Sequence, residues 1–147
     1  MGLRCMSLRS FFRHQNTKLF PSIHLYWKKY KDSLNTNLRK IQDIVLAGDG
    51  RHDSMGHCAK YCAYSIFCCN GDINKTVDFC LVQRNEAGNS PAMEYLAFTK
   101  ALERLLKDGL NATTFISDRH TSISKHMKEK LPKITHYFDL WHLVKSK

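Results

Sequence analysis

Two aspartates, each at the end of a short apolar run, could together bind a divalent cation. Asp49 follows the apolar run 44–47 within a Gly-Asp-Gly triplet, and Asp118 follows the β-branched run 113–117. Each run predicts a buried strand that carries a carboxylate at its end. If the two strands lie side by side and parallel, the carboxylates converge. Paired carboxylate oxygens are the ligands that Mg²⁺ prefers.

The elements around these aspartates follow an order that predicts a fold. A meander of strands followed by alternating helices and strands indicates a mixed sheet with right-handed crossovers. This β-β-β-α-β-α-β order is the ribonuclease-H-like α/β fold, and it brings both aspartates to one crevice at the strand ends. The predicted strands are 44–47, 59–69, 75–84, 113–117 and 134–138, and the predicted core helices are 90–107 and 123–131.

Local signals set several boundaries. Asn70-Gly71 predicts a hairpin, Ser90-Pro91 predicts the start of a helix with Ser90 as its N-cap, and Gly109 is the expected left-handed residue after it. A polar loop is expected at 85–89. Alternation in the strand 75–84 predicts one buried apolar face: the apolar set is Val77, Phe79 and Leu81, and the opposite set is Thr76, Asp78 and Cys80.

The chain is basic, with a formal net charge of +10 over 147 residues. We expect a basic N-terminal segment at 1–42 and a core at 43–147. Residues 1–20 are expected to be irregular, and the apolar spacing from Ile23 to Ile41 predicts an amphipathic helix with Lys28 and Lys29 off its stripe. Such a charge favours nucleic acid as the partner, bound through its phosphates.

Targeting signals are not evident. The N-terminus lacks the apolar core of a signal peptide, and no run approaches the ~20 apolar residues of a membrane span. We therefore expect an intracellular protein, nuclear or cytoplasmic, with six reduced cysteines, no membrane partner and no small organic cofactor.

Three motifs in this order resemble the landmarks of transposon-derived DDE transposase-like proteins. The motifs are GDGRHDSMGH at 48–57, SDRH at 117–120 and DLWHLVK at 139–145, and the resemblance extends from about Phe11 to the end. It implies a ribonuclease-H-like core that cleaves and joins DNA with Mg²⁺ or Mn²⁺. Asp49 and Asp118 would be the first and second catalytic acids, and a homo-oligomer is compatible with this class.

The resemblance departs from the family pattern in two places. Met55 stands where the family loop often has proline, which changes the stiffness of that loop. Catalysis in this family also needs a third acid, usually a glutamate on a helix well beyond the last strand. After Asp118 the chain offers only Glu129 and Asp139. Unless Asp139 substitutes as a metal ligand, we expect a truncated core that is inactive as this chain.

Further side chains are candidates for binding DNA. Arg51, Arg119 and His120 flank the two acids, and Lys28 and Lys29 lie on the basic helix. Positive charge at these positions would offset the repulsion between the acids and phosphate. A co-opted module that binds nucleic acid or a protein without catalysis is the alternative function.

Two other constellations stay open as alternatives. The first is a cluster of two histidines and four cysteines that could bind zinc and thereby stabilise the domain. Its spacing is not that of a zinc finger, so we predict free buried thiols and no zinc site. The same cluster could supply a Cys-His nucleophile, but no third orienting group is evident. Glu94 is the second: it lies early in the first core helix, where ribonuclease-H enzymes place an acid, although helix-dipole stabilisation explains it equally well. The zinc-type cluster comprises His52, His57, Cys58, Cys62, Cys68 and Cys69.

Overall fold

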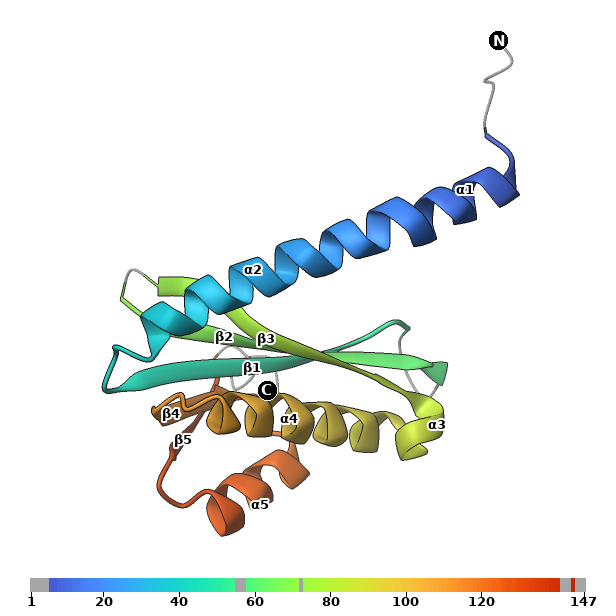
Figure 1. Cartoon of the computed structure of the whole chain (residues 1–147). Helices are drawn as coiled ribbons and strands as arrows, with labels where there is room; N and C mark the ends of the chain where they lie inside the picture. The colour runs from blue at the N-terminus through green and yellow to red at the C-terminus, as the bar shows by residue number, and fades with distance from the viewer. Residues whose placement is uncertain (1–5, 55–57, 72, 141–143, 145–147) are drawn as a thin grey trace. The chain divides into compact units, whose positions relative to one another are not determined.

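The computed structural model describes residues 6–54, 58–71, 73–140 and 144, and the chain divides into two compact units, Met1–Thr36 and Asn37–Lys147 (Figure 1). The second unit holds a five-stranded mixed sheet. Its elements are β1 (Ile44–His52), β2 (Tyr61–Asn70), β3 (Ile73–Gln83), α3 (Arg84–Ala87), α4 (Ser90–Lys107), β4 (Ala112–Ser117), α5 (Thr121–Lys130) and β5 (Thr135–Phe138).

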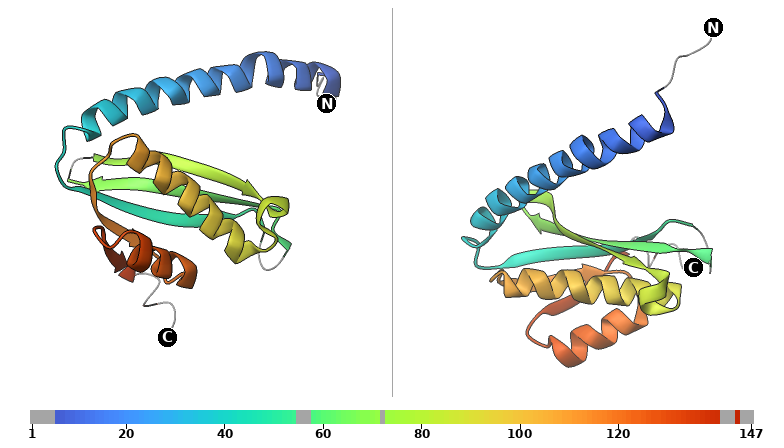
Figure 2. Two further views of the ribbon diagram at one scale, coloured as in Figure 1. Left: turned by 60° about the horizontal axis from the view of Figure 1, so that its bottom comes forward. Right: turned by 45° about the vertical axis from the view of Figure 1, so that its right-hand side comes forward.

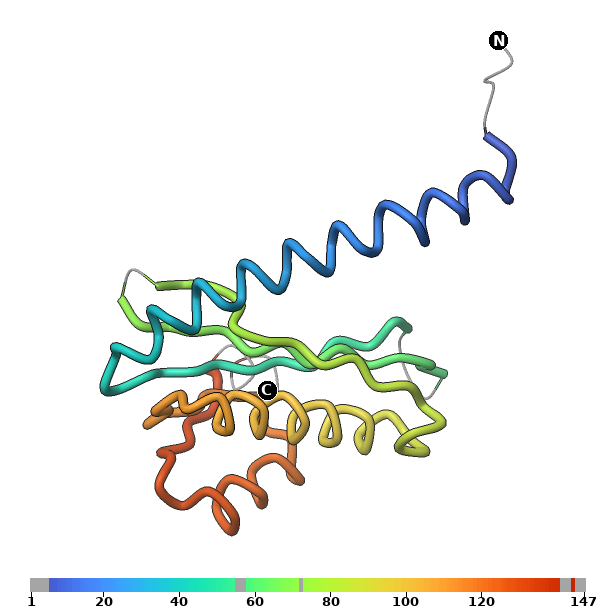
Figure 3. The backbone as a smooth tube through the Cα atoms, in the orientation of Figure 1, coloured from blue at the N-terminus to red at the C-terminus, as the bar shows by residue number. Residues whose placement is uncertain are grey.

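The strands follow the order β3-β2-β1-β4-β5, as predicted. β1, β2 and β3 form an antiparallel meander, and β4 and β5 run parallel to β1. The path can be followed in Figure 3, where the chain leaves the edge strand β3, crosses through α4 and returns beside β1. This is the mixed α/β sheet of the ribonuclease-H-like fold.

One face of the sheet is covered by α4, and α5 lies next to α4 beside β5 (Figure 2). Six residues of α4 face inward and pack on the buried side chains of β1, β2 and β4. Phe98 lies at the centre of this layer, with its ring edge-on to Tyr64 and Phe115. The inward residues of α4 are Met93, Ala97, Phe98, Ala101, Leu102 and Leu105.

The first unit is helical from Leu8 onward, which corrects the prediction of an irregular segment for residues 8–20. Its described elements are α1 (Leu8–His14), a π-helical turn η1 (Gln15–Leu19) and α2 (Phe20–Leu38), whose last two residues belong to the second unit. Ser7 caps α1 by accepting a hydrogen bond from the backbone N–H of Ser10 at 3.2 Å. Pro21 is the second residue of α2 and lies in its first turn, two residues after the end of η1. The wider π turn there accommodates a residue that has no N–H to donate.

The first strand continues through the glycines that were expected to break it. β1 runs to His52, and Asp49 pairs with Ser65 of β2 inside the ladder. Gly48 and Gly50 are needed for close approach rather than for a turn. A Cβ on Gly48 would lie 2.6 Å from the Tyr64 hydroxyl, so only glycine leaves room for that ring.

Val77 is buried as predicted, but beyond it the alternation in β3 is opposite to the prediction. Phe79 and Leu81 are exposed, whereas Asp78 and Cys80 are buried. The reason is a register shift opposite Ile66 and the next residue of β2, which inserts one extra residue in β3 and inverts the side-chain phase beyond it. Buried Asp78 is compensated by Arg104 of α4, whose Nε donates to its carboxylate at 3.0 Å.

Two helix boundaries also differ by small amounts. Asn89, not Ser90, is the N-cap of α4, since its side chain accepts from the Ala92 N–H at 2.9 Å. The expected loop at 85–89 contains the single turn α3. The left-handed conformation of Gly109 (φ 82°) after α4 is confirmed. None of the helices in the described residues combines the length and hydrophobicity that crossing a membrane requires.

We expect Gly48→Ala to destabilise the second unit by about 1–3 kcal/mol, because the new methyl group meets the buried rings of Tyr64 and Phe115. Urea denaturation of the full chain measures this. Ser65→Ala, in the neighbouring strand, is the control and should stay within about 0.5 kcal/mol of wild type. Equal stability of Gly48→Ala and wild type would contradict the close approach.

Candidate functional site

The parallel ladders bring the sequence-predicted acids together. The last pair between β1 and β4 joins Ala47 to Ile116, so Asp49 and Asp118 each lie two residues beyond it. The ladder between β4 and β5 ends one residue before Asp118 and Asp139. The backbone N–H of Asp139 also donates to the carbonyl of Ser117 at 2.9 Å. Three acids from neighbouring strands therefore reach the same edge of the sheet.

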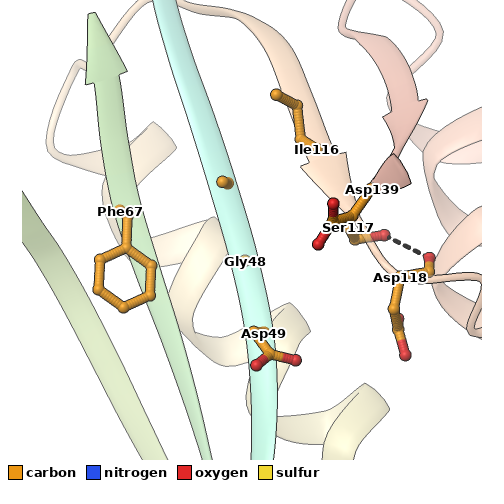
Figure 4. A pocket seen from close by; sticks show the side chains of 8 residues that line it. Gly48, Asp49, Phe67, Ile116, Ser117, Asp118 and Asp139 are labelled. Atoms are coloured by element: carbon orange, nitrogen blue, oxygen red, sulfur yellow. Dashed lines mark hydrogen bonds between the residues drawn. The ribbon is translucent and has the colours of Figure 1, made fainter. Parts of the chain in front are cut away.

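These acids line one pocket of about 270 Å³ (Figure 4). Asp49 is exposed, and Asp118 and Asp139 are half-buried. The pocket floor is apolar where Phe67 and Ile116 face it. The pocket can thus present carboxylate oxygens to solvent from a rigid sheet edge.

Hydrogen bonds hold the loop that carries Asp118. The Asp118 carboxylate accepts from the backbone N–H of His120 at 3.3 Å. The buried hydroxyl of Ser117 donates to the Asp118 carbonyl at 2.9 Å, as Figure 4 shows, and lies 3.0 Å from His136 Nε2. Burial lowers the pKa of His136. This network fixes where the Asp118 side chain leaves the backbone.

A fourth acid, Glu94 of α4, lies beneath the opposite side of β1. Its side chain is 12% exposed and contacts His52 at 3.5 Å. Gly50 makes room for it, because a Cβ there would lie 2.6 Å from the Glu94 carboxyl carbon. Burial, and next the negative charge of Asp118, raise the pKa of Glu94. Glu94, for which the sequence allowed two interpretations, therefore interacts electrostatically with an acid of the pocket.

Buried polar atoms without a partner gather around Glu94. Among the described residues, no hydrogen-bond partner reaches the Tyr64 hydroxyl, Nδ1 of His52 or either ring nitrogen of His120. Burial raises the pKa of Tyr64, and the charges of Glu94, Asp118 and Asp49 raise it further. Sequence reasoning missed Tyr64, whose only signal was an aromatic residue in a strand.

The predicted basic contacts divide between the two units. Arg51 lies on β1 two residues after Asp49, so both project from the same face of the strand, and it is exposed. Arg119 is exposed next to Asp118, and His120 is half-buried. Lys28 and Lys29 are exposed on α2 in the first unit.

The pocket offers the type of ligand that a hard cation prefers, but too few side chains lie close enough together to bind one ion. Carboxylate oxygens are suited to Mg²⁺ or Mn²⁺. Within the described ranges, however, no group of three or more His, Cys, Asp or Glu side chains is close enough to hold one metal ion. The same finding covers the described members of the zinc-type cluster. Cys62 and Cys68 of this cluster are buried as predicted, and burial raises the pKa of Cys62 to about 12. Cys58 and Cys69 are exposed, which corrects the prediction of buried thiols at these two positions, and His57 lies outside the described residues.

Comparison with known proteins adds one solved structure. No protein-family model matches the chain, and no curated protein matches it. The chain is similar to a chain of the Drosophila P element transposase strand transfer complex, with a TM-score of 0.46 and 15% identity. The match covers 99% of this chain and 44% of that chain, so this chain spans less than half of the transposase chain it matches.

We expect Glu94→Gln to raise the melting temperature, and by more at about pH 8 than at about pH 4. Because the pKa of Glu94 is raised, the folded state keeps a proton that the unfolded chain loses at lower pH. The stability that this group contributes is therefore full below the ordinary glutamate pKa and is lost as pH rises from there through the raised pKa of the folded state. Glutamine does not ionise, so the Glu94→Gln variant does not lose this stability as the pH rises.

Glu103→Gln, on the same helix but 59% exposed, is the matched control. Its effect should stay within about 0.5 kcal/mol at both pH values. An advantage of Glu94→Gln that is equal at both pH values would contradict a raised pKa for Glu94.

Proposed function

We propose that the second unit is a transposase-type core that acts on DNA phosphodiesters with a divalent cation, and that Asp49 and Asp118 are its first two acids. The observation that carries the proposal is the parallel pairing of β1 and β4, which directs both carboxylates to one pocket. A ribonuclease-H-like sheet with acids just beyond the end of the β1–β4 parallel ladder supports the same function.

The residues of the pocket would have different roles in the reaction. Asp49 and Asp118 would hold the cation, whose Lewis acidity would polarise the phosphodiester. Arg51 projects beside Asp49 and Arg119 follows Asp118, so both guanidinium groups can bind phosphate oxygens and orient the DNA backbone. Asp139 supplies a third carboxylate at the rim of the pocket.

The proposal includes low activity for this chain by itself. Strand transfer in this class requires three acids around the metal, and the described residues do not gather three metal ligands at one point. Asp139 would therefore have to move closer when the metal and DNA bind. Without that movement, the chain binds the cation and the DNA but does not complete the reaction.

We expect Mn²⁺ at about a hundred times its dissociation constant to stabilise the full chain by about 2.7 kcal/mol, measured by thermal melts with and without the ion. The double variant Asp49→Asn/Asp118→Asn should lose this increment. Removing two like charges can itself raise stability, so the Mn²⁺-dependent difference is the quantity to compare.

The control for this test is Glu103→Gln/Glu129→Gln, which removes the same charge away from the pocket and should keep the full increment. A Mn²⁺ increment that survives in the aspartate variant would place the ion elsewhere. Cleavage of a labelled DNA duplex by wild type with Mn²⁺, absent in the double variant, would show activity and correct the expectation that the chain is inactive.

A second candidate function is DNA binding without catalysis, and the exposed basic side chains of α2 favour it. Lys28→Ala/Lys29→Ala should weaken DNA binding uniformly across sequences. The slope of log affinity against log salt should fall in magnitude by up to about 1.8, since each phosphate contact contributes about 0.9. Fluorescence anisotropy with labelled duplex measures the slope.

Lys75→Ala/Lys107→Ala removes two exposed lysines from the second unit and is the matched control, with an unchanged slope expected.

The Asp49→Asn variant distinguishes the two candidate functions. Binding that gains from Mn²⁺ only when Asp49 is present supports the metal-dependent core. Binding that ignores both Mn²⁺ and Asp49→Asn supports the non-catalytic module.

A further inference from the structure

The face of the sheet opposite α4 carries an apolar patch in β2 and β3. Tyr61, Phe79 and Leu81 form this patch and are 40%, 46% and 57% exposed, whereas the next residue along each strand is buried. The β2–β3 ladder pairs Ala63 with Leu81 and Ser65 with Phe79. Small side chains of β2 therefore separate the patch from β1, and a flat ligand can lie across them.

The patch is continuous with the acidic pocket. Arg51, Ala63 and Leu81 form one row across β1, β2 and β3. Asp49 begins the neighbouring row, and Phe67 of β2 lines the pocket together with Asp49 (Figure 4). Neighbouring strands are about 5 Å apart, so the row from β1 to β3 spans about 10 Å. One ligand can therefore contact both the pocket and the patch.

Hydrogen bonds at both ends of Tyr61 restrict its ring. The Asp53 carboxylate accepts from the backbone N–H groups of Lys60 and Tyr61, at 2.9 Å and 3.1 Å. At the far end of the ring, the Tyr61 hydroxyl accepts from Nε2 of Gln83 at 3.5 Å. A ring restricted in this way loses little further freedom when a ligand stacks on it.

The charges on this face favour different parts of a ligand at different positions. Arg51 pairs with Ala63, so Tyr61 lies two residues, about 7 Å, further along β2. The exposed guanidinium of Arg51 attracts a phosphate group. The hydrogen bond from the Tyr61 N–H lowers the pKa of Asp53, so this carboxylate is charged at neutral pH and repels phosphate. A phosphate is therefore favoured at Arg51, and an uncharged group is favoured at Tyr61.

The size of the patch favours a small planar group over a protein. Three side chains that each expose about 100 Å² give roughly 300 Å² in total. A specific protein interface covers about 800 Å² on each partner, which is more than twice this area. Exposed aromatic side chains on an open sheet face are a recurring surface for stacking unpaired bases.

From these observations we infer that the patch binds an unpaired nucleobase, which stacks on Tyr61 while Arg51 binds a phosphate of the same strand. The inference rests on the proposed function, because it places the base beside the phosphodiester on which the pocket acts. The bases of an intact duplex are stacked on one another and do not reach the ring. The preferred substrate is therefore DNA that is single-stranded next to the reacting phosphate.

Fluorescence anisotropy of the full chain with Mn²⁺ tests the inference by comparing a labelled duplex with the same duplex carrying a short single-stranded extension. Wild type should bind the extended duplex at least about fivefold more tightly, since one stacked base contributes that much. Tyr61→Leu should lose this preference, because leucine is apolar but has no ring to stack, and Tyr61→Trp should keep it. Tyr137→Leu is the matched control: Tyr137 is 57% exposed on β5, outside the patch, and the variant should keep the preference.

A 2-aminopurine base in the extension reports stacking directly. Its fluorescence should fall when wild type binds and should stay unchanged with Tyr61→Leu. Equal affinity for the two duplexes, or a preference that Tyr61→Leu retains, overturns the inference. An oligomer that Tyr61→Leu dissociates in sedimentation also overturns it, because the patch would then be a protein contact.

The Mn²⁺-dependent melts of the Asp49→Asn/Asp118→Asn variant separate this inference from the proposed function. An Mn²⁺ increment without a preference for the extended duplex overturns the base site and leaves the metal-dependent core. A Tyr61-dependent preference without an Mn²⁺ increment overturns the metal-dependent core and supports the base site.

Discussion

The whole second unit depends on β1 being paired on both sides in different directions. Its antiparallel ladder with β2 continues the meander, while its parallel ladder with β4 requires the crossover through α4. A parallel neighbour brings like strand ends together, and this places Asp49 beside Asp118. Without the β1–β4 pair, Asp49 and Asp118 would not be neighbours and would not share a pocket.

Two glycines in β1 leave space for neighbouring side chains that a Cβ at these positions would meet. Gly48 leaves room for the Tyr64 ring, and Gly50 leaves room for Glu94. The strand therefore has acids on both of its faces, Asp49 on one and Glu94 on the other. Burial, and next the repulsion from the negative charge of Asp118, raise the pKa of Glu94. A bound cation would relieve the repulsion, which is consistent with the proposed metal dependence.

The topology could be predicted because hydrophobic runs, the Asn-Gly turn and the helix caps act locally, and crossover handedness then leaves few arrangements. The errors arose where a distant contact decided the outcome. Gly48 and Gly50 carry the signal of a turn, yet the approach of Tyr64 and Glu94 makes them strand residues. The bulge in β3 depends on its pairing with β2, so the burial of Asp78 could not be inferred from alternation alone.

The site was only partly predictable for the same reason. Asp49 and Asp118 are marked by strand ends, and their meeting follows from the sheet order. Glu94 is different, because its spacing on α4 is equally consistent with a capping charge. Its importance depends on burial beneath β1 and on its electrostatic coupling to Asp118, which are properties of the folded chain. A carboxylate whose charge is opposed by burial and by a neighbouring acid either keeps a proton or requires a cation nearby. The cation that we propose for the neighbouring pocket would meet that requirement.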